Sequence, residues 1–158
     1  LATETQEIAD YLRSVMIQKH GEHAIREHIA DTRDTLCYAT NDNQSATYGL
    51  MEAPADLAIV VGGYNSSNTT HLVELLEQKF PTYFVKDEHE LISGDAIHSF
   101  NIHTKEVEAF VNYMPSDIPI IAITSGASCP DAVVDRVIQK LLSLKGLHKS
   151  IDEVIASI

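Results

Sequence analysis

Short apolar runs alternate with segments of helical periodicity along most of the chain. Three of the runs have the pattern of buried parallel strands and cover residues 56–61, 81–85 and 118–124. Apolar side chains recur at helical spacing after the first and the last run, over residues 66–79 and 131–144. Because strands and helices alternate, we predict an α/β fold in which helices flank a parallel sheet.

The remaining segments are less regular. We predict helices at 3–20, 41–51 and 151–155, and a short strand or helix at 24–30. Residues 97–102 and 107–111 predict an extended pair that forms a small hairpin at the edge of the sheet. The first 30 or so residues have no strand of their own, so we assign them to the end of a preceding domain.

Charge and composition narrow the classes of function. Acidic residues outnumber basic ones by 23 to 11, giving a formal net charge of −12, which disfavours nucleic acid and anionic membranes as partners. No apolar run approaches the roughly 20 residues of a membrane span. Two cysteines are too few for a disulfide scaffold and the amino end has no secretion signal, so we expect a cytoplasmic location. The chain begins at Leu1, and we expect it to be a piece of a longer protein.

Polar residues follow the first predicted strand where it meets a helix. Gly62 and Gly63 allow a sharp turn. After Tyr64, the five residues from Asn65 to Thr69 are all polar and uncharged. A helix start offers free amides and the positive end of the helix dipole, at the edge of the sheet where ligands bind. Helix capping alone needs one such residue, so the run favours an anion site. It lacks the Gly-Lys pair of a Walker loop.

A second strand-to-helix turn has a similar composition. Ser125, Gly126 and Ser128 follow the last predicted strand, and Ser128 and Asp131 have the spacing of a capping box. A well-made helix start explains this turn as readily as an anion site does. Because both turns leave the carboxyl ends of parallel strands, we expect them at the same sheet edge, which favours a shared anion pocket.

Cysteines and histidines give weaker signals. Cys37 lies in a polar loop without a nearby cysteine, and a lone cysteine is most often a small buried apolar residue. Cys129 opens a helix, where thiol acidity can rise, but a small residue in a tight turn is the simpler interpretation. The eight histidines form no ligand pair, and His71 is the best placed, one turn into a helix.

Three motifs together resemble the 4-hydroxy-3-methylbut-2-enyl diphosphate reductase (LytB) family. Residues 34–40, followed by Asn43-Gln44, are similar to the family's third cluster-cysteine motif. Residues 62–68 are similar to its Asn-Ser-Ser-Asn substrate motif, and residues 125–131 to its final Gly-Ala-Ser motif. Their order and separation also match, over essentially the whole chain. Asn43 departs from the pattern, because the family often has arginine there.

The resemblance implies an oxidoreductase that converts (E)-4-hydroxy-3-methylbut-2-enyl diphosphate to isopentenyl and dimethylallyl diphosphate in isoprenoid precursor biosynthesis. It implies a [4Fe-4S] cluster held by three cysteines, one from each of three similar α/β domains, with Cys37 as the third. An external electron donor such as ferredoxin or flavodoxin is implied as well. The residues implied to bind the diphosphate are Ser66, Ser67, Asn68 and Ser128.

On this resemblance, residues 1–33 are the end of the second domain and residues 34–158 are the third, carboxy-terminal domain. One cysteine cannot hold the cluster, so we expect the chain alone to be inactive, and no residue in it is assigned a catalytic role. The alternative is a stand-alone α/β module that binds a phosphorylated small molecule, with Cys37 structural. A flavodoxin-like carrier fits less well, because the first turn lacks the residues expected around a flavin.

Overall fold

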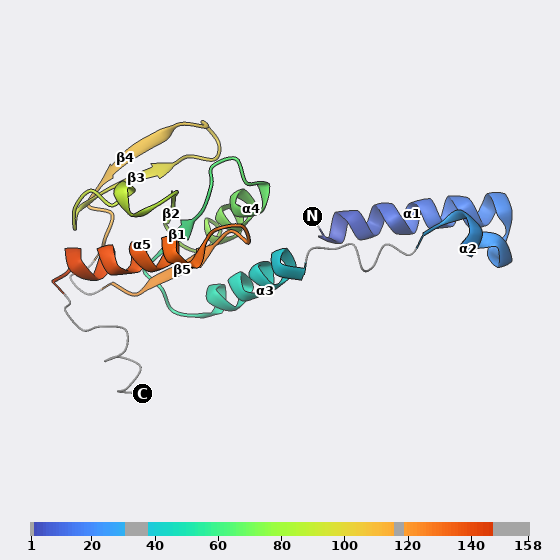
Figure 1. Cartoon of the computed structure of the whole chain (residues 1–158), viewed down its shortest axis with the longest axis horizontal. Helices are drawn as coiled ribbons and strands as arrows, with labels where there is room; N and C mark the ends of the chain where they lie inside the picture. Colours follow the sequence, from blue (N-terminus) through green and yellow to red (C-terminus); the bar gives the residue numbers. More distant parts are fainter. Residues whose placement is uncertain (1, 31–37, 116–118, 147–158) are drawn as a thin grey trace. The chain divides into compact units, whose positions relative to one another are not determined.

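The chain divides into two compact units, Leu1–Asn41 and Asp42–Ile158, which are described separately (Figure 1). The structure is a computed structural model and describes residues 2–30, 38–115 and 119–146. The predicted domain boundary at 33/34 lies in a segment outside the described residues, as does the predicted helix at 151–155. No helix of the described residues is long and apolar enough to cross a membrane.

The first unit is a helical hairpin. Helix α1, Ala2–His20, ends at Gly21, whose φ of 83° is a conformation that favours glycine. The short helices η1, Glu22–Ala24, and α2, Ile25–His28, follow, so the segment predicted as a strand or helix is helical. The rings of His20 and His28 stack with their centroids 3.8 Å apart. The chain therefore folds back on α1.

The second unit contains the predicted parallel sheet. Its strand order is β2 (Thr82–Val85), β1 (Leu57–Val61) and β5 (Ile121–Ser125). Both pairings of the central strand are parallel, and all five of its residues are buried. The continuous apolar pattern of β1 follows from this position, since both of its faces are covered. The prediction of a parallel α/β sheet is confirmed.

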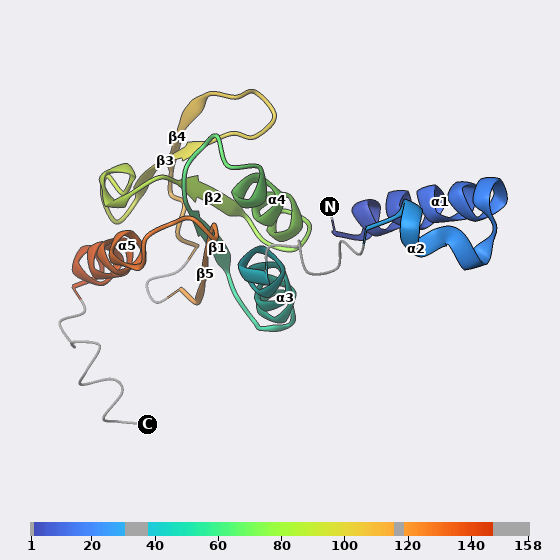
Figure 2. The same cartoon turned by 45° about the vertical axis from the view of Figure 1, so that its right-hand side comes forward.

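Helices cover the two faces of this sheet (Figure 2). Alternate residues of β1 point to opposite faces. Ala58 and Val60 pack in a cluster with apolar residues of α4, Ser67–Leu76. The other three residues of β1 pack with Val137 and Leu141 of α5, Asp131–Leu144. Figure 2 accordingly shows α4 and α5 on opposite sides of the strands.

The predicted edge hairpin is also present. Strands β3, Ala96–Phe100, and β4, Val107–Val111, pair antiparallel as a separate two-stranded sheet. The backbone N–H of Phe84 in β2 donates a hydrogen bond to the buried Ser99 Oγ at 2.8 Å. This hydrogen bond to a side chain joins the hairpin to β2, the edge strand of the parallel sheet.

Two elements begin three residues away from their predicted starts. Helix α3, Tyr38–Glu52, begins three residues before the predicted start at 41. Strand β5 begins later than predicted. The residue before it, Ile120, donates its N–H to Asp56 Oδ2 at 2.7 Å, and Asp56 N–H donates to Ile120 O at 2.8 Å. These two bonds join the entries to β1 and β5.

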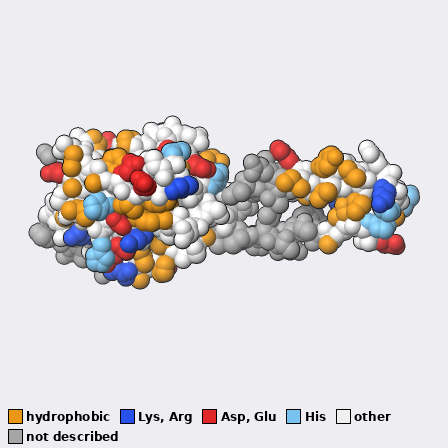
Figure 3. Space-filling model, turned by 90° about the horizontal axis from the view of Figure 1, so that it is seen from above, with side chains coloured by type: hydrophobic (Ala, Val, Ile, Leu, Met, Phe, Trp, Pro, Cys, Tyr) orange, Lys and Arg blue, Asp and Glu red, His pale blue; other side chains and the backbone are white. Residues whose placement is uncertain are grey.

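The surface of the second unit carries a mixture of side chains. Figure 3 shows acidic, basic and histidine side chains interspersed with apolar ones on the face in view. The acidic side chains on this face therefore do not form one continuous patch. A local anion site is compatible with the overall negative charge.

Candidate functional site

The two polar turns lie next to each other at the carboxyl edge of the sheet. Val61 ends β1 and is paired with Ser125, which ends β5. The N–H of Gly126 donates to Val61 O at 3.0 Å, so the second turn begins in contact with the end of β1. The N–H of Gly62 donates in the same way to Val85 O at 3.0 Å. The expectation that both turns share one edge is confirmed.

The side chain of Thr69 lies between the two turns. Thr69 is 1% exposed. A Cβ atom placed on Gly62 would lie 2.9 Å from Thr69 Oγ1, and one placed on Gly126 would lie 2.1 Å from the same atom. Both distances are shorter than real contacts of a Cβ atom, so a larger residue at either position would displace the threonine or the turn. The sequence motifs therefore contain these glycines because the two turns approach one threonine.

Ser66 is the N-cap of helix α4. Its Oγ accepts a hydrogen bond from the Thr69 N–H at 3.3 Å, which is the geometry of an N-cap. A hydroxyl that accepts this bond keeps its own proton and can donate it to an anion. Capping and anion binding are therefore compatible in the same residue.

The next two residues differ in exposure. Ser67 is exposed at the first position of α4. Asn68 is half-buried, and both polar atoms of its amide are shielded and make no hydrogen bond to any described residue. Buried amides are nearly always hydrogen-bonded, so the Asn68 amide is available for a further partner.

The second turn is built differently from the prediction. Cys129 N–H donates to Gly126 O at 2.8 Å, which closes a turn before the helix. Pro130 is the N-cap of α5 and no side chain caps it, so the capping box predicted for Ser128 and Asp131 is wrong. The helix begins too late for Ser128 to be its cap. Ser128 is exposed, and helix capping does not account for its presence.

Helix α3 supports the second turn from the other side. Asn43 Nδ2 donates to Ser125 O at 2.9 Å, and the hydroxyls of Thr47 and Thr124 lie 3.2 Å apart. Thr47 also donates to Asn43 O at 2.8 Å and is fully buried. Sequence reasoning noted Asn43 only as a departure from a pattern. The signal for its role was its spacing of four residues from Thr47, which places both on one helical face.

Tyr64 supports the first turn. Its ring stacks on Phe100 with centroids 4.5 Å apart and meets Phe84 edge-on at 5.2 Å. The β1–α4 turn is therefore packed against both β2 and the hairpin. Sequence reasoning assigned no role to Tyr64, because its partners are distant in the sequence.

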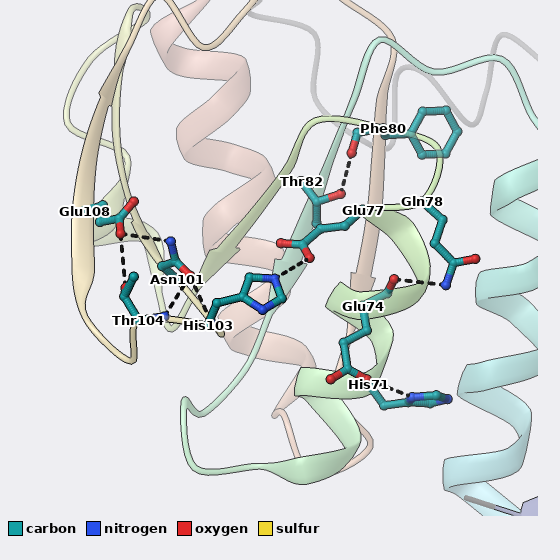
Figure 4. Close-up of polar contacts among 10 residues, drawn as sticks. All are labelled: His71, Glu74, Glu77, Gln78, Phe80, Thr82, Asn101, His103, Thr104 and Glu108. Atoms are coloured by element: carbon teal, nitrogen blue, oxygen red, sulfur yellow. Dashed lines mark hydrogen bonds and ion pairs between the residues drawn. The ribbon is translucent and has the colours of Figure 1, made fainter.

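Cys129 and His71 form no metal site with the other described residues. Cys37 lies outside the described residues. Burial and the nearby negative charge of Asp131 raise the pKa of the Cys129 thiol, which is opposite to the acidity that a helix start can give. His71 Nδ1 lies 3.3 Å from Glu74 Oε2 on its own helix (Figure 4). Among the described residues, no group of three His, Cys, Asp or Glu could hold a metal ion.

The fold and the two turns define an α/β domain with adjoining polar helix starts at one sheet edge. The family model described as LytB protein matches residues 1–142, and the chain belongs to this family. The resemblance seen in the motifs is thereby confirmed.

Named relatives are longer than this chain. The 4-hydroxy-3-methylbut-2-enyl diphosphate reductase of Gloeobacter violaceus is 36% identical over 95% of the chain, which spans 36% of that relative. The enzyme of the same name from Synechococcus sp. (strain WH7803) is 40% identical over 91% of the chain, again 36% of its length. A solved structure of (E)-4-hydroxy-3-methyl-but-2-enyl diphosphate reductase overlaps 69% of the chain and 32% of its own, with 23% identity and a TM-score of 0.49.

Proposed function

We propose that this chain is the carboxy-terminal part of a 4-hydroxy-3-methylbut-2-enyl diphosphate reductase. The whole enzyme would convert (E)-4-hydroxy-3-methylbut-2-enyl diphosphate to isopentenyl and dimethylallyl diphosphate in the methylerythritol-phosphate pathway of isoprenoid synthesis. Membership of the LytB family and the names of the relatives support this proposal. The observation that carries it is the meeting of two polar turns around Thr69 at one sheet edge.

The part of the reaction assigned to this chain is diphosphate binding. Ser66, Ser67 and Asn68 would donate from the first turn and Ser128 from the second. All four are neutral, so they can bind an anion within an acidic protein by hydrogen bonds to charged oxygens. The start of α4 adds free backbone amides and the positive end of its dipole. These groups would hold the diphosphate and leave the allylic end of the substrate to other parts of the enzyme.

Cys37 would supply one thiolate to a [4Fe-4S] cluster. Thiolate sulfur is the ligand that such clusters take, and two further cysteines would come from outside this chain. When bound, the cluster would deliver two electrons from a donor such as ferredoxin or flavodoxin. With two protons, they would release the substrate hydroxyl as water. We propose a cytoplasmic location for the whole enzyme that contains this chain.

Binding of inorganic diphosphate to the 158-residue chain tests the anion site. Ser67→Ala removes one donor without removing the cap of α4, so we expect diphosphate affinity to fall about tenfold or more, as for a hydrogen bond to a charged group. Ser143→Ala is the matched control, because Ser143 is exposed near the far end of α5. Titration calorimetry measures both. Equal affinities for the two variants would contradict the assignment of Ser67.

The role of Cys37 is tested in the whole protein that contains this chain. After anaerobic reconstitution, Cys37→Ser should lack the iron–sulfur absorption band and the turnover of the allylic diphosphate. The 158-residue chain should show neither signal, because it carries one of the three proposed cysteine ligands. A cluster band with turnover in the isolated chain would contradict the proposal. Unchanged turnover in Cys37→Ser would contradict its role as a cluster ligand. Absence of both the cluster band and turnover in the unaltered whole protein would favour a module that only binds a phosphorylated ligand.

A further inference from the structure

Thr69 is a buried polar residue whose hydroxyl makes no hydrogen bond to any described residue. It is the third residue of α4 and is 1% exposed. Its Oγ1 is shielded from solvent. A buried hydroxyl without a partner is unfavourable compared with an apolar group of the same shape. No hydrogen bond to a described residue therefore accounts for this side chain, whose methyl and hydroxyl groups fill the space in front of the two turns.

That volume occupies space in front of two glycines. A Cβ on Gly62 would lie 2.9 Å from Thr69 Oγ1 and 3.0 Å from Cγ2. A Cβ on Gly126 would lie 2.1 Å from Oγ1 and 3.3 Å from the threonine Cβ. One side chain thus contacts both turns at their glycines. Its backbone N–H is also bonded to Ser66 Oγ, so its position is fixed by the cap of α4.

We propose that Thr69 is a positioning residue that sets the separation between the two turns, so that one diphosphate can be held by both. The inference rests on the proposed diphosphate site. A single phosphate can be bound by one turn, whereas a diphosphate with one phosphoryl group on each turn requires a fixed spacing. Thr69 would therefore determine the preference for diphosphate over phosphate without touching either anion.

The test compares the affinities of the 158-residue chain for inorganic diphosphate and inorganic phosphate. Thr69→Ala removes the spacer, and Gly126→Ala forces it aside. We expect each to lower diphosphate affinity about tenfold while phosphate affinity changes by about twofold or less. The double variant should recover part of the preference, because alanine at position 69 removes the close contact with Oγ1 and leaves only the Cβ–Cβ distance of 3.3 Å to relax. Thr69→Val, the conservative variant, should retain it, since it keeps the volume and loses only the hydroxyl.

Val73→Ala controls for loss of packing. Val73 is 1% exposed and lies one turn further along α4, and the atoms nearest to the Cβ positions of both glycines belong to Thr69 instead. Val73→Ala should lower thermal stability, because it leaves a cavity in the core. It should leave the ratio of diphosphate affinity to phosphate affinity unchanged.

The outcomes separate this inference from the function on which it rests. Failure of the unaltered chain to bind diphosphate would overturn the proposed anion site, and with it the spacing role. Normal diphosphate binding in Thr69→Ala would overturn the spacing role alone. If Thr69→Ala lowered the affinities for phosphate and diphosphate equally, the spacing role would also fail. It would fail too if Thr69→Val lost diphosphate affinity as Thr69→Ala does.

Discussion

Tyr64 donates a hydrogen bond from its hydroxyl to Glu90 Oε1 at 3.0 Å and so ties the β1–α4 turn to the short helix η3, Glu88–Glu90. Glu90 is 8% exposed and also lies 3.7 Å from Lys86 Nζ and 3.6 Å from His98 Nδ1. Burial raises the pKa of Tyr64, and the bond to the Glu90 carboxylate raises it further. The phenol therefore remains a neutral donor over the physiological pH range.

Tyr64→Phe tests this anchor. The substitution keeps the ring packed on Phe100 but leaves a buried carboxylate with one donor fewer. We expect the free energy of unfolding to fall by about 1.5–3 kcal/mol, the range for a hydrogen bond to a charged group. Urea denaturation measures this change. Tyr48→Phe is the control, since Tyr48 is 54% exposed, and equal effects of the two substitutions would argue against the anchor.

Asn43 should support the second turn through its bond to Ser125 O. Asn43→Ala removes the donor, and Asn43→Asp replaces it with a carboxylate that has no proton to donate at neutral pH. We therefore expect both variants to bind diphosphate more weakly, with Asn43→Asp the weaker, because its negative charge faces a carbonyl oxygen. Calorimetry with inorganic diphosphate ranks them. If Asn43→Asp bound as tightly as the unaltered chain, α3 would have no part in shaping the site.

The thiol of Cys129 should react slowly at mildly alkaline pH. Burial is the main cause of its raised pKa, and the charge of Asp131 adds to it, so little thiolate is present near pH 8. Asp131→Asn removes the negative charge and should lower the pKa, which shifts the alkylation profile to lower pH. Rates of reaction with iodoacetamide, measured in a Cys37→Ser background, report on this thiol alone. An unmoved profile would mean that Asp131 does not influence it.

The parts of the fold that sequence reasoning predicts are those set by local pattern. The unbroken apolar run of β1 identifies a central parallel strand, and glycine followed by polar residues identifies each turn. The two short extended segments at 97–102 and 107–111 identify the hairpin. Each of these signals is contained within about ten residues, so none depends on knowing what the chain packs against.

The contacts that complete the site are long-range and could not be read in this way. Asn43 and Ser125 are 82 positions apart, and Tyr64 and Glu90 are 26 apart. The same limit explains the wrong capping box at Ser128. Its spacing to Asp131 was suitable, but a turn closed by Gly126 delays the helix to Pro130. A local motif gives the residues of a cap without giving the residue at which the helix begins.

Ser66 and Ser128 should separate helix capping from anion binding. Ser66 caps α4 through Thr69 N–H, whereas Ser128 does not cap α5. Ser66→Ala should therefore lower stability by about 1 kcal/mol, the usual value of an N-cap, and also weaken diphosphate binding. Ser128→Ala should weaken binding and leave stability within about 0.5 kcal/mol, as expected for an exposed substitution.

Chemical denaturation and diphosphate calorimetry on the same two variants make this comparison. A loss of stability in Ser128→Ala equal to that in Ser66→Ala would mean that the second turn depends on its serine for structure. Unchanged diphosphate affinity in Ser128→Ala would leave the first turn as the whole anion site. The proposed sharing of one diphosphate between the turns would then fail, because Ser128 is the donor assigned to the second of them.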